Sequence, residues 1–237
     1  MVAATAVVIG AGGGIGGALV AAVEATGRFD RVHALSRRPA SDRDCVRGGL
    51  IDVGDEASIA SAAARIEAPV DLVIIATGLL HEAGRMPEKA LGELDGAALA
   101  RLFEINSIGP ALVFKHFVPL LAKGRRAVIA AMSARVGSIS DNRSGGWYGY
   151  RASKAALNMI VKSAAIEIRR SRPEAVCVAV HPGTVDTALS RPFQARVPAG
   201  TLFTPAWSAE RLLSVIDSLT PEDSGRIFDW DGHEIIP

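Results

Sequence analysis

A tyrosine and a lysine stand four residues apart in a segment with few helix breakers, Tyr150-Arg151-Ala152-Ser153-Lys154. Residues i and i+4 project from one face of a helix, so the phenol and the ammonium can act in one site. A neighbouring ammonium favours the phenolate and lowers the pKa of a tyrosine from its usual value of about 10. Such a phenol can exchange a proton with a carbonyl or alcohol oxygen, which makes Tyr150 the candidate general acid or base and Lys154 its partner.

A run of glycines follows the first apolar segment of the chain, in the order Gly10-Ala11-Gly12-Gly13-Gly14-Ile15-Gly16. Glycines permit positive φ and let backbone amides approach a ligand closely. The positive end of a helix dipole attracts an anion to the same place. A glycine loop between a strand and a helix therefore predicts a site for the pyrophosphate of a dinucleotide.

The second apolar segment ends at Leu35-Ser36-Arg37-Arg38. A dinucleotide-binding fold places here the group that contacts the adenosine ribose. An acidic side chain would bind the 2′-hydroxyl of NAD, whereas a cation pairs with the 2′-phosphate of NADP. Ser36 and Arg37 therefore favour NADP, as NADPH in the reducing direction, and make NAD the weaker candidate.

With the spacing GxxxGxG at its start and YxxxK further on, the chain resembles the short-chain dehydrogenase/reductase family. Segments such as Ser133 to Asn142 also resemble the subgroup that contains C-factor-like proteins and carbonyl reductases. The resemblance implies a Rossmann fold, a nicotinamide cofactor, and hydride transfer that interconverts a carbonyl and an alcohol. Tyr150 would be the general acid or base of that reaction, assisted by Lys154.

The resemblance also implies cofactor contacts along the chain. Asp52 would meet the adenine, and Gly78 would line the adenosine side, although the family commonly has asparagines shortly before that glycine. The backbone near Val185 would orient the nicotinamide, and Thr187 would contact its carboxamide or the pyrophosphate. The complete set implied to bind the cofactor is Gly10, Gly14, Ile15, Gly16, Ser36, Arg37, Asp52, Val53, Gly78, Tyr150, Lys154, Pro182, Gly183, Val185 and Thr187.

Two further catalytic residues are implied by the same resemblance. Asn106 would help to connect Lys154 to solvent protons through ordered water, and a serine near the end of the fifth strand would accompany the tyrosine. Ser133 directly follows that strand, and Ser138 is its rival in the loop beyond. Alignment on Gly137 instead puts Ala134 in the place of the serine. Because a strand end positions a hydroxyl more rigidly than a loop, Ser133 is the predicted catalytic serine.

Short apolar runs alternate with segments of helical spacing, which predicts an α/β fold: a doubly wound, mostly parallel sheet of about seven strands with helices on both faces. We expect one NAD(P)-binding Rossmann domain over residues 1–237, with substrate loops near 138–149 and 190–205. The expected strands are Ala4 to Ile9, Arg31 to Leu35, Gly49 to Asp52, Val70 to Ala76, Ala127 to Met132, Ala175 to His181 and Arg226 to Phe228. The expected helices are Ala18 to Ala25, Leu99 to Leu121, with Pro110 shortening or kinking it, Tyr150 to Arg170 and Ala209 to Ser218.

The composition restricts the partners of the chain. A net charge of +1 over 237 residues provides no strong field for nucleic acid, so a small carbonyl or alcohol substrate is expected. Cys45 and Cys177 have no metal-ligand or redox spacing, the five histidines form no ligand cluster, and no catalytic metal is expected. The glycines interrupt the apolar N-terminal stretch, which favours a cytoplasmic protein without membrane contact. The long apolar helices predict a homodimer or homotetramer.

Two other functions are compatible with the same residues. A dinucleotide-binding sensor or signalling protein of the C-factor type would keep the fold without useful catalysis, although the presence of both Tyr150 and Lys154 argues against it. An epimerase or dehydratase would use hydride transfer only transiently or not at all. The identity of the substrate depends on the two loops, which the sequence pattern does not determine.

Overall fold

The computed structural model describes residues 3–82 and 84–237 and contains one seven-stranded sheet in the order β3-β2-β1-β4-β5-β6-β9. Every neighbouring pair in this sheet is parallel. The predicted Rossmann-like α/β class is therefore confirmed. The strands are β1 (Thr5–Ile9), β2 (Arg31–Ser36), β3 (Val46–Leu50), β4 (Leu72–Ile75), β5 (Ala127–Met132), β6 (Ala175–His181) and β9 (Ile227–Asp229).

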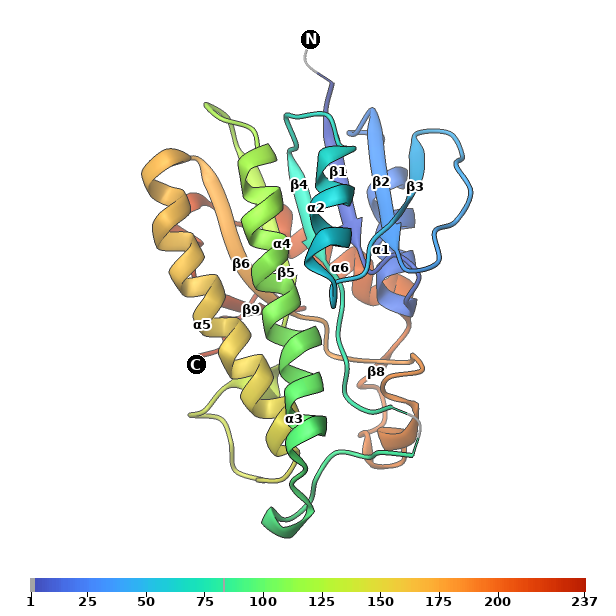
Figure 1. Ribbon diagram of the computed structural model, residues 1–237, viewed down its shortest axis with the longest axis vertical. Helices are drawn as coiled ribbons and strands as arrows, with labels where there is room; N and C mark the ends of the chain where they lie inside the picture. The colour runs from blue at the N-terminus through green and yellow to red at the C-terminus, as the bar shows by residue number, and fades with distance from the viewer. Residues whose placement is uncertain (1–2, 83) are drawn as a thin grey trace.

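Helices cover both faces of the sheet, because the central strands are apolar on both sides. Ile9 and Ile75 face the layer of α2 (Glu56–Ala64), α4 (Gly109–Phe117) and α5 (Tyr148–Ser171). Val8 and Ile74 face α1 (Gly14–Ala25) and α6 (Pro205–Ser218) on the other side. Figure 1 shows the first layer in front of the sheet, with α6 behind it.

Helix α2 was not expected from the sequence. Its segment, Glu56 to Ala64, consists largely of small residues that give little helical contrast between apolar and polar faces. The side chain of Asp55 accepts a hydrogen bond from the backbone N–H of Ala57 and so caps the helix. Ile59 is the large residue that fixes α2 on the sheet, since it is completely buried.

The predicted long helix between β4 and β5 is a composite of several helical segments. Helix α3 (Gly96–Phe103) continues through a π-helical turn, η2 (Glu104–Ile108), into α4, and the 3₁₀ turn η3 (Val118–Leu120) ends it. Pro110 occupies the first turn of α4, where its missing N–H is tolerated because the π-turn has already changed the hydrogen-bond pattern. Pro110 was expected to shorten or kink the helix, whereas the irregular turn lies directly before it, at Glu104–Ile108.

Gly96 to Leu120 is long and apolar enough, by length and composition alone, to cross a membrane. Here it is a layer of the α/β fold, with Phe114 and Phe117 buried against the sheet. Lys115 and His116 on its outer side pair with Glu56 of α2. Its apolar composition is therefore used in the core of this structure.

The two expected substrate loops lie beyond the carboxyl ends of β5 and β6. Residues 138–147 follow the 3₁₀ turn η4 (Arg135–Gly137) and lead into α5. Residues 186–201 contain the 3₁₀ turn η5 (Arg191–Arg196) and connect β7 (Thr184–Val185) to β8 (Leu202–Phe203), which pair in parallel. Two more 3₁₀ turns, η1 (Leu91–Glu93) and η6 (Pro221–Asp223), lie before α3 and before β9.

Candidate functional site

A cleft of about 560 Å³ opens at the carboxyl ends of β1 and β4. The strand order reverses between these two strands, and doubly wound sheets bind ligands at such a switch point. The volume lies within the usual range of small-molecule sites. The cleft is lined by Gly10, Gly12, Gly13, Ser36, Arg37, Arg38, Ile51, Asp52, Val53, Ala76, Thr77, Gly78, Leu79, Glu82, Arg101 and Ile105.

The glycine loop is shaped by close backbone contacts. Gly10 has φ +91°, and a Cβ atom there would lie 2.8 Å from the carbonyl oxygen of Ala76 on the neighbouring strand. A Cβ atom at Gly16 would overlap the carbonyl oxygen of Gly10. Both positions therefore require glycine, and the loop leaves its open side to the cleft as a cradle for a pyrophosphate.

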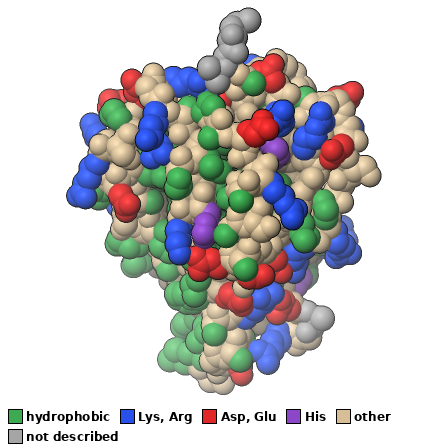
Figure 2. All heavy atoms as spheres, turned by 45° about the horizontal axis from the view of Figure 1, so that its top comes forward, with side chains coloured by type: hydrophobic (Ala, Val, Ile, Leu, Met, Phe, Trp, Pro, Cys, Tyr) green, Lys and Arg blue, Asp and Glu red, His purple; other side chains and the backbone are tan. Residues whose placement is uncertain are grey.

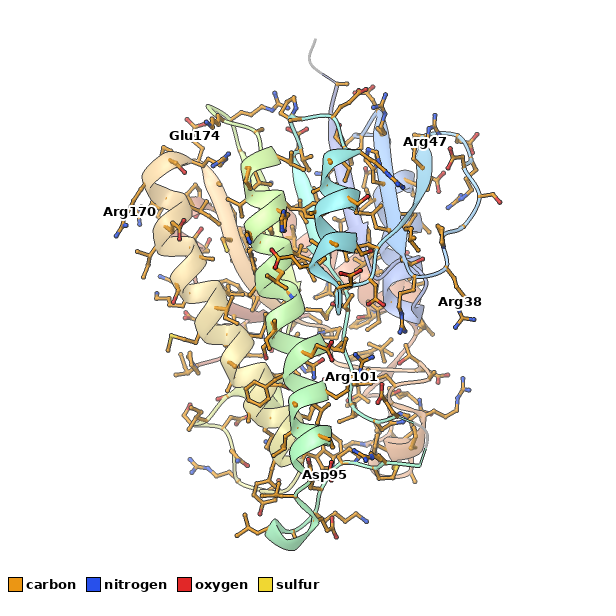
Figure 3. The ribbon with its side chains drawn as sticks, viewed as in Figure 1. Arg38, Arg47, Asp95, Arg101, Arg170 and Glu174 are labelled. Carbon is orange, nitrogen blue, oxygen red and sulfur yellow. The ribbon has the colours of Figure 1, made fainter. Side chains whose placement is uncertain are left out.

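The ribose end of the cleft is built by the turn after β2. The buried Ser36 hydroxyl donates to the carbonyl oxygen of Arg38 at 2.8 Å and closes this turn. Arg37 and Arg38 are exposed, and in Figure 3 Arg38 lies at the outer margin beyond β2. Thr77 also lines the cleft, and its buried hydroxyl has no partner among the described residues. An unpartnered hydroxyl, a glycine cradle and free guanidinium groups together fit a phosphorylated dinucleotide.

Arg101 is a residue of the cleft that the sequence did not indicate. It extends from α3, and its guanidinium donates to Glu104 at 2.9 Å and to Glu82 at 3.3 Å. The pair with Glu104 raises the pKa of Arg101 above its already high ordinary value, although its burial opposes this. The i,i+3 spacing of Arg101 and Glu104 was visible in the sequence, but only the fold brings Glu82 and the cleft to them.

Tyr150 and Lys154 are both buried on one face of the first turns of α5. The Lys154 ammonium lies 6.0 Å from the centre of the Tyr150 ring and donates to the carbonyl oxygen of Met132 at 2.7 Å. A Cβ atom at Gly78 would lie 3.7 Å from the same ammonium. The predicted pair is thus assembled next to the glycine that ends the cleft.

The expectation that Lys154 lowers the pKa of Tyr150 is wrong. Burial raises the pKa of Tyr150 to about 12 and lowers the pKa of Lys154 to about 7, because both charged forms lose solvation. The Lys154 amine lies 6.0 Å from the centre of the ring and is only partly protonated at neutral pH, so its charge does not compensate for the lost solvation of a phenolate. Tyr150 therefore stays protonated at neutral pH, which is the form that donates a proton.

Asn106 lies in the π-turn η2 and is completely buried. Its amide accepts from the backbone N–H of Leu79 at 2.8 Å and donates to the carbonyl oxygen of Leu79 at 2.7 Å. It also donates to the hydroxyl of Ser153 on α5 at 3.0 Å. In this structure Asn106 connects the segment after β4 to the catalytic helix, and its predicted part in proton relay through water stays a prediction.

The structure does not bring the hydroxyl of either candidate serine to Tyr150. Ser133 donates to the Oδ1 atom of Asn158 at 2.6 Å, and Asn158 lies eight residues after Tyr150, which is about 12 Å along the helix axis. Ser138 donates to the carbonyl oxygen of Ile236 near the C-terminus at 2.5 Å. Ala134 is instead the residue that packs against the tyrosine.

The path of the chain at the end of β5 accounts for this result. Ala131 faces the α5 side of the sheet and Met132 the α6 side, and Ser133, the first residue after the strand, turns to Asn158 on the α5 side. Ala134 follows outside the strand and belongs to the buried cluster that contains Tyr150. The Tyr150, Lys154 and Asn158 spacing of four residues was a sequence signal for the missed partner of Ser133.

Glu88 is a second residue that the sequence did not reveal. Helix α5 starts after Trp147, a residue in the left-handed region (φ +52°) that offers no side-chain cap. The carboxylate of the buried Glu88 accepts a hydrogen bond from the backbone N–H of Gly149 at 3.3 Å. The backbone carbonyl oxygen of Glu88 accepts from the backbone N–H of Trp147 at 2.5 Å. A carboxylate at this end also complements the helix dipole, so Glu88 holds the first turn that carries Tyr150.

The segment after β6 closes over the glycine loop. A Cβ atom at Gly14 would lie 2.8 Å from the Thr187 methyl group, which brings these two predicted cofactor residues together. Gly183 has φ +76° and is packed by Phe203 and Trp230. The cofactor residues predicted from the sequence that do not line the open cleft are Gly14, Ile15, Gly16, Tyr150, Lys154, Pro182, Gly183, Val185 and Thr187.

Residues 4–197 match the family model described as short chain dehydrogenase. The chain is 44% identical over 147 residues to C-signal of Myxococcus xanthus, covering 62% of this chain and 82% of that protein. It is 37% identical over 183 residues to 1-hydroxy-2-glutathionyl-2-methyl-3-butene dehydrogenase of Rhodococcus sp. strain AD45, covering 77% and 76% of the two chains.

Solved structures show the same fold over nearly the whole chain. The NADPH-bound carbonyl reductase from chicken fatty liver superposes with a TM-score of 0.85 at 25% identity, covering 98% of this chain and 94% of that one. The carbonyl reductase Sniffer of Drosophila melanogaster superposes with a TM-score of 0.83 at 21% identity, covering 100% of both chains. The second likeness concerns the fold alone.

Proposed function

Since this chain belongs to the short chain dehydrogenase family and is an oxidoreductase of that family, we propose that it reduces a small carbonyl compound with NADPH, using Tyr150 as the proton donor. The observation that carries the proposal is the buried pair of Tyr150 and Lys154, whose ammonium lies next to Gly78, a residue of the same cleft that Ser36, Arg37 and Arg38 line. Structures of similar fold bind NADP or NADPH, which supports the same cofactor here.

Each group of residues has a distinct part in the proposed reaction. NADPH, when bound, supplies the hydride that reduces the carbonyl carbon. The glycine loop would hold its pyrophosphate, and the arginines after β2 would hold its 2′-phosphate. Lys154 is a donor beside the phenol, and Tyr150 gives its proton to the carbonyl oxygen.

Steady consumption of NADPH with a panel of aldehydes and ketones tests the proposed activity. We expect turnover that depends on the carbonyl compound and is faster with NADPH than with NADH at equal concentration. The measurement is the loss of reduced-nicotinamide absorbance together with identification of the alcohol. An absence of turnover on every compound, with NADPH binding intact, would contradict the reductase assignment.

Removal of the two arginines after β2 is expected to abolish the preference for NADPH. The double variant Arg37→Ala/Arg38→Ala loses charge-assisted hydrogen bonds to the 2′-phosphate, so its NADPH affinity should fall roughly 10- to 100-fold while NADH affinity is unchanged. Equilibrium titration of cofactor fluorescence measures both affinities. The double variant Arg169→Ala/Arg170→Ala, at the distant end of α5, is the charge-matched control. Equal losses for both cofactors would show that the arginines do not read the phosphate.

A non-catalytic dinucleotide-binding sensor or signalling protein of the C-factor type is the second candidate. The 44% identity to C-signal favours it, as does the alanine that packs on Tyr150. This function predicts NADPH binding without turnover, which the same panel of carbonyl compounds distinguishes. The buried and intact pair of Tyr150 and Lys154 supports the enzyme instead.

Self-association and a cytoplasmic location are parts of the same proposal. Large hydrophobic side chains are exposed on the outer helical layer, namely Ile108 next to α4 and Met159 and Ile166 on α5. Figure 2 shows charges of both signs dispersed over the visible face and hydrophobic side chains gathered along its lower edge. These features support a homodimer or homotetramer. Cys45 and Cys177 are free thiols, which suits a reducing compartment.

A further inference from the structure

The surroundings of Tyr150 are apolar. Tyr150 belongs to a buried hydrophobic cluster with Leu80 and Ala134, and four partly buried side chains pack against this cluster, namely Val136, Trp147, Leu189 and Phe193. The rings of Trp147 and Phe193 lie 4.9 Å apart, and the Trp147 ring lies 6.3 Å from that of Tyr150. These residues come from four separate segments of the chain. A carbonyl compound that reaches the phenol must therefore displace or pack against hydrophobic side chains.

The serine hydroxyls near this part of the chain already donate hydrogen bonds to other groups. The Ser133 hydroxyl donates to Asn158, and the Ser138 hydroxyl donates to the carbonyl oxygen of Ile236 in the C-terminal segment. Ser153 donates to the carbonyl oxygen of Tyr150 within α5, so its hydroxyl also serves the helix backbone. Lys154 donates to the carbonyl oxygen of Met132. Among the hydroxyls of Ser133, Ser138, Ser153 and Tyr150, that of Tyr150 is thus the one that remains to bind a carbonyl oxygen.

We infer that Ala134 makes this site selective for electron-poor carbonyl groups, that is, aldehydes and ketones with an electron-withdrawing substituent next to the carbonyl carbon and an apolar body. This inference rests on the proposed reductase function. Reduction adds a hydride equivalent from NADPH to the carbonyl carbon and the Tyr150 proton to its oxygen. Negative charge grows on that oxygen before the proton arrives, and one hydrogen bond stabilises it less than two.

The size of the effect follows from sites that bind a developing oxyanion. Removal of one of their donors slows turnover by about 10²- to 10³-fold. A substrate whose own substituent withdraws electron density needs the second donor less. The methyl group of Ala134 therefore penalises electron-rich carbonyl compounds more strongly than electron-poor ones.

The test uses para-substituted benzaldehydes, from methoxy to nitro, which change carbonyl electron density with little change at the reacting end. For the wild-type enzyme we expect kcat/KM to rise by about 100-fold or more across the series, on the scale of one missing donor. In Ala134→Ser the kcat/KM values of the electron-rich benzaldehydes should rise most. The ratio between the highest and the lowest kcat/KM of the series should therefore fall roughly tenfold. NADPH affinity, measured by fluorescence, should be the same in both proteins.

Two control variants distinguish the absence of a donor at position 134 from an effect of the neighbouring Ser133 hydroxyl. Ala134→Gly adds no donor and should keep the steep dependence of the wild type, even if Ala134→Ser were to fold poorly. Ser133→Ala removes the neighbouring hydroxyl and should leave the range across the series unchanged. A flat series in the wild type, or a range that widens in Ser133→Ala, would overturn the inference while leaving the reductase function in place.

The failure of the proposed function has a different signature. If NADPH binds but neither the wild type nor Ala134→Ser reduces any aldehyde, the reductase assignment fails together with the inference. If the wild type is inactive and only Ala134→Ser turns over, the inference fails with the proposed function, because a wild-type site without turnover selects no carbonyl compound.

Discussion

Tyr150→Phe is expected to lower kcat for carbonyl reduction by about 10³-fold, within the range by which a positioned proton donor contributes. The ring stays in its apolar surroundings, so the substitution removes the hydroxyl and little packing. Although Tyr150 is in the set implied to bind the cofactor, NADPH affinity should change less than twofold, because Tyr150 does not line the cleft in which other elements would hold the pyrophosphate and ribose. Single-turnover absorbance measurements with saturating NADPH report the chemical step.

Tyr148→Phe is the matched control for this experiment. Tyr148 begins the same helix, is only partly buried, and has no lysine four residues later. It should reduce substrate at the wild-type rate. Comparable losses in both variants would indicate damage to the first turn of α5, and full activity in Tyr150→Phe would exclude Tyr150 as the proton donor.

The pKa of Tyr150 gives this prediction a pH dependence. Since burial raises that pKa to about 12, the phenol is protonated throughout the neutral range, and reduction should show no loss from its ionisation there. The reverse reaction needs the phenolate and should accelerate as the pH rises toward that value. A reduction rate that falls near neutral pH in the wild type but not in Tyr150→Phe would contradict this assignment.

Lys154→Met is expected to have the second large effect, a loss of about 10²-fold or more in kcat/KM, because the donor beside the phenol disappears. The methionine side chain fills a similar volume, so the buried position remains packed. The carbonyl oxygen of Met132 would lose its partner, and some loss of stability can accompany the loss of activity. Parallel unfolding and turnover measurements distinguish the two effects.

The same variant tests the protonation state of Lys154 through stability. Its pKa is about 7 in the folded protein and 10.5 ordinarily, so between these values the unfolded chain binds a proton that the folded chain does not. The free energy of unfolding of the wild type should therefore rise with pH, by up to about 1.4 kcal/mol per unit. Lys154→Met should lack this rise.

Urea unfolding between pH 7 and 8 measures this difference without interference from the other buried groups. Burial raises the pKa of Cys177 from 9.0 to about 12 and that of Tyr150 from 10.0 to about 12, so these groups reduce stability only at higher pH. His181, whose pKa burial lowers to about 4, titrates below this window. Parallel curves for wild type and variant would show that Lys154 is charged in the folded protein.

Features determined by neighbours in the chain could be predicted from the sequence. The apolar runs of β1, β4, β5 and β6 are long enough to identify buried parallel strands, and their alternation with helices implied the α/β class. The glycine loop and the i,i+4 spacing of Tyr150 and Lys154 are local patterns as well. The short, alanine-rich helix α2 could not be predicted in this way, because small residues give no clear helical period.

The tertiary structure decided how distant residues meet, and with it the chemical character of the site. The path of the chain beyond β5 turned Ser133 toward Asn158 and placed Ala134 in the cluster of Tyr150, a difference of one residue that the motif spacing could not settle. The pKa of Tyr150 depends on desolvation by Leu80, Leu189 and Phe193, which come from distant loops. The spacing in the sequence thus determined which groups share a helix face. Their protonation and hydrogen-bond partners depend on burial, which arises only when the loops close around that helix.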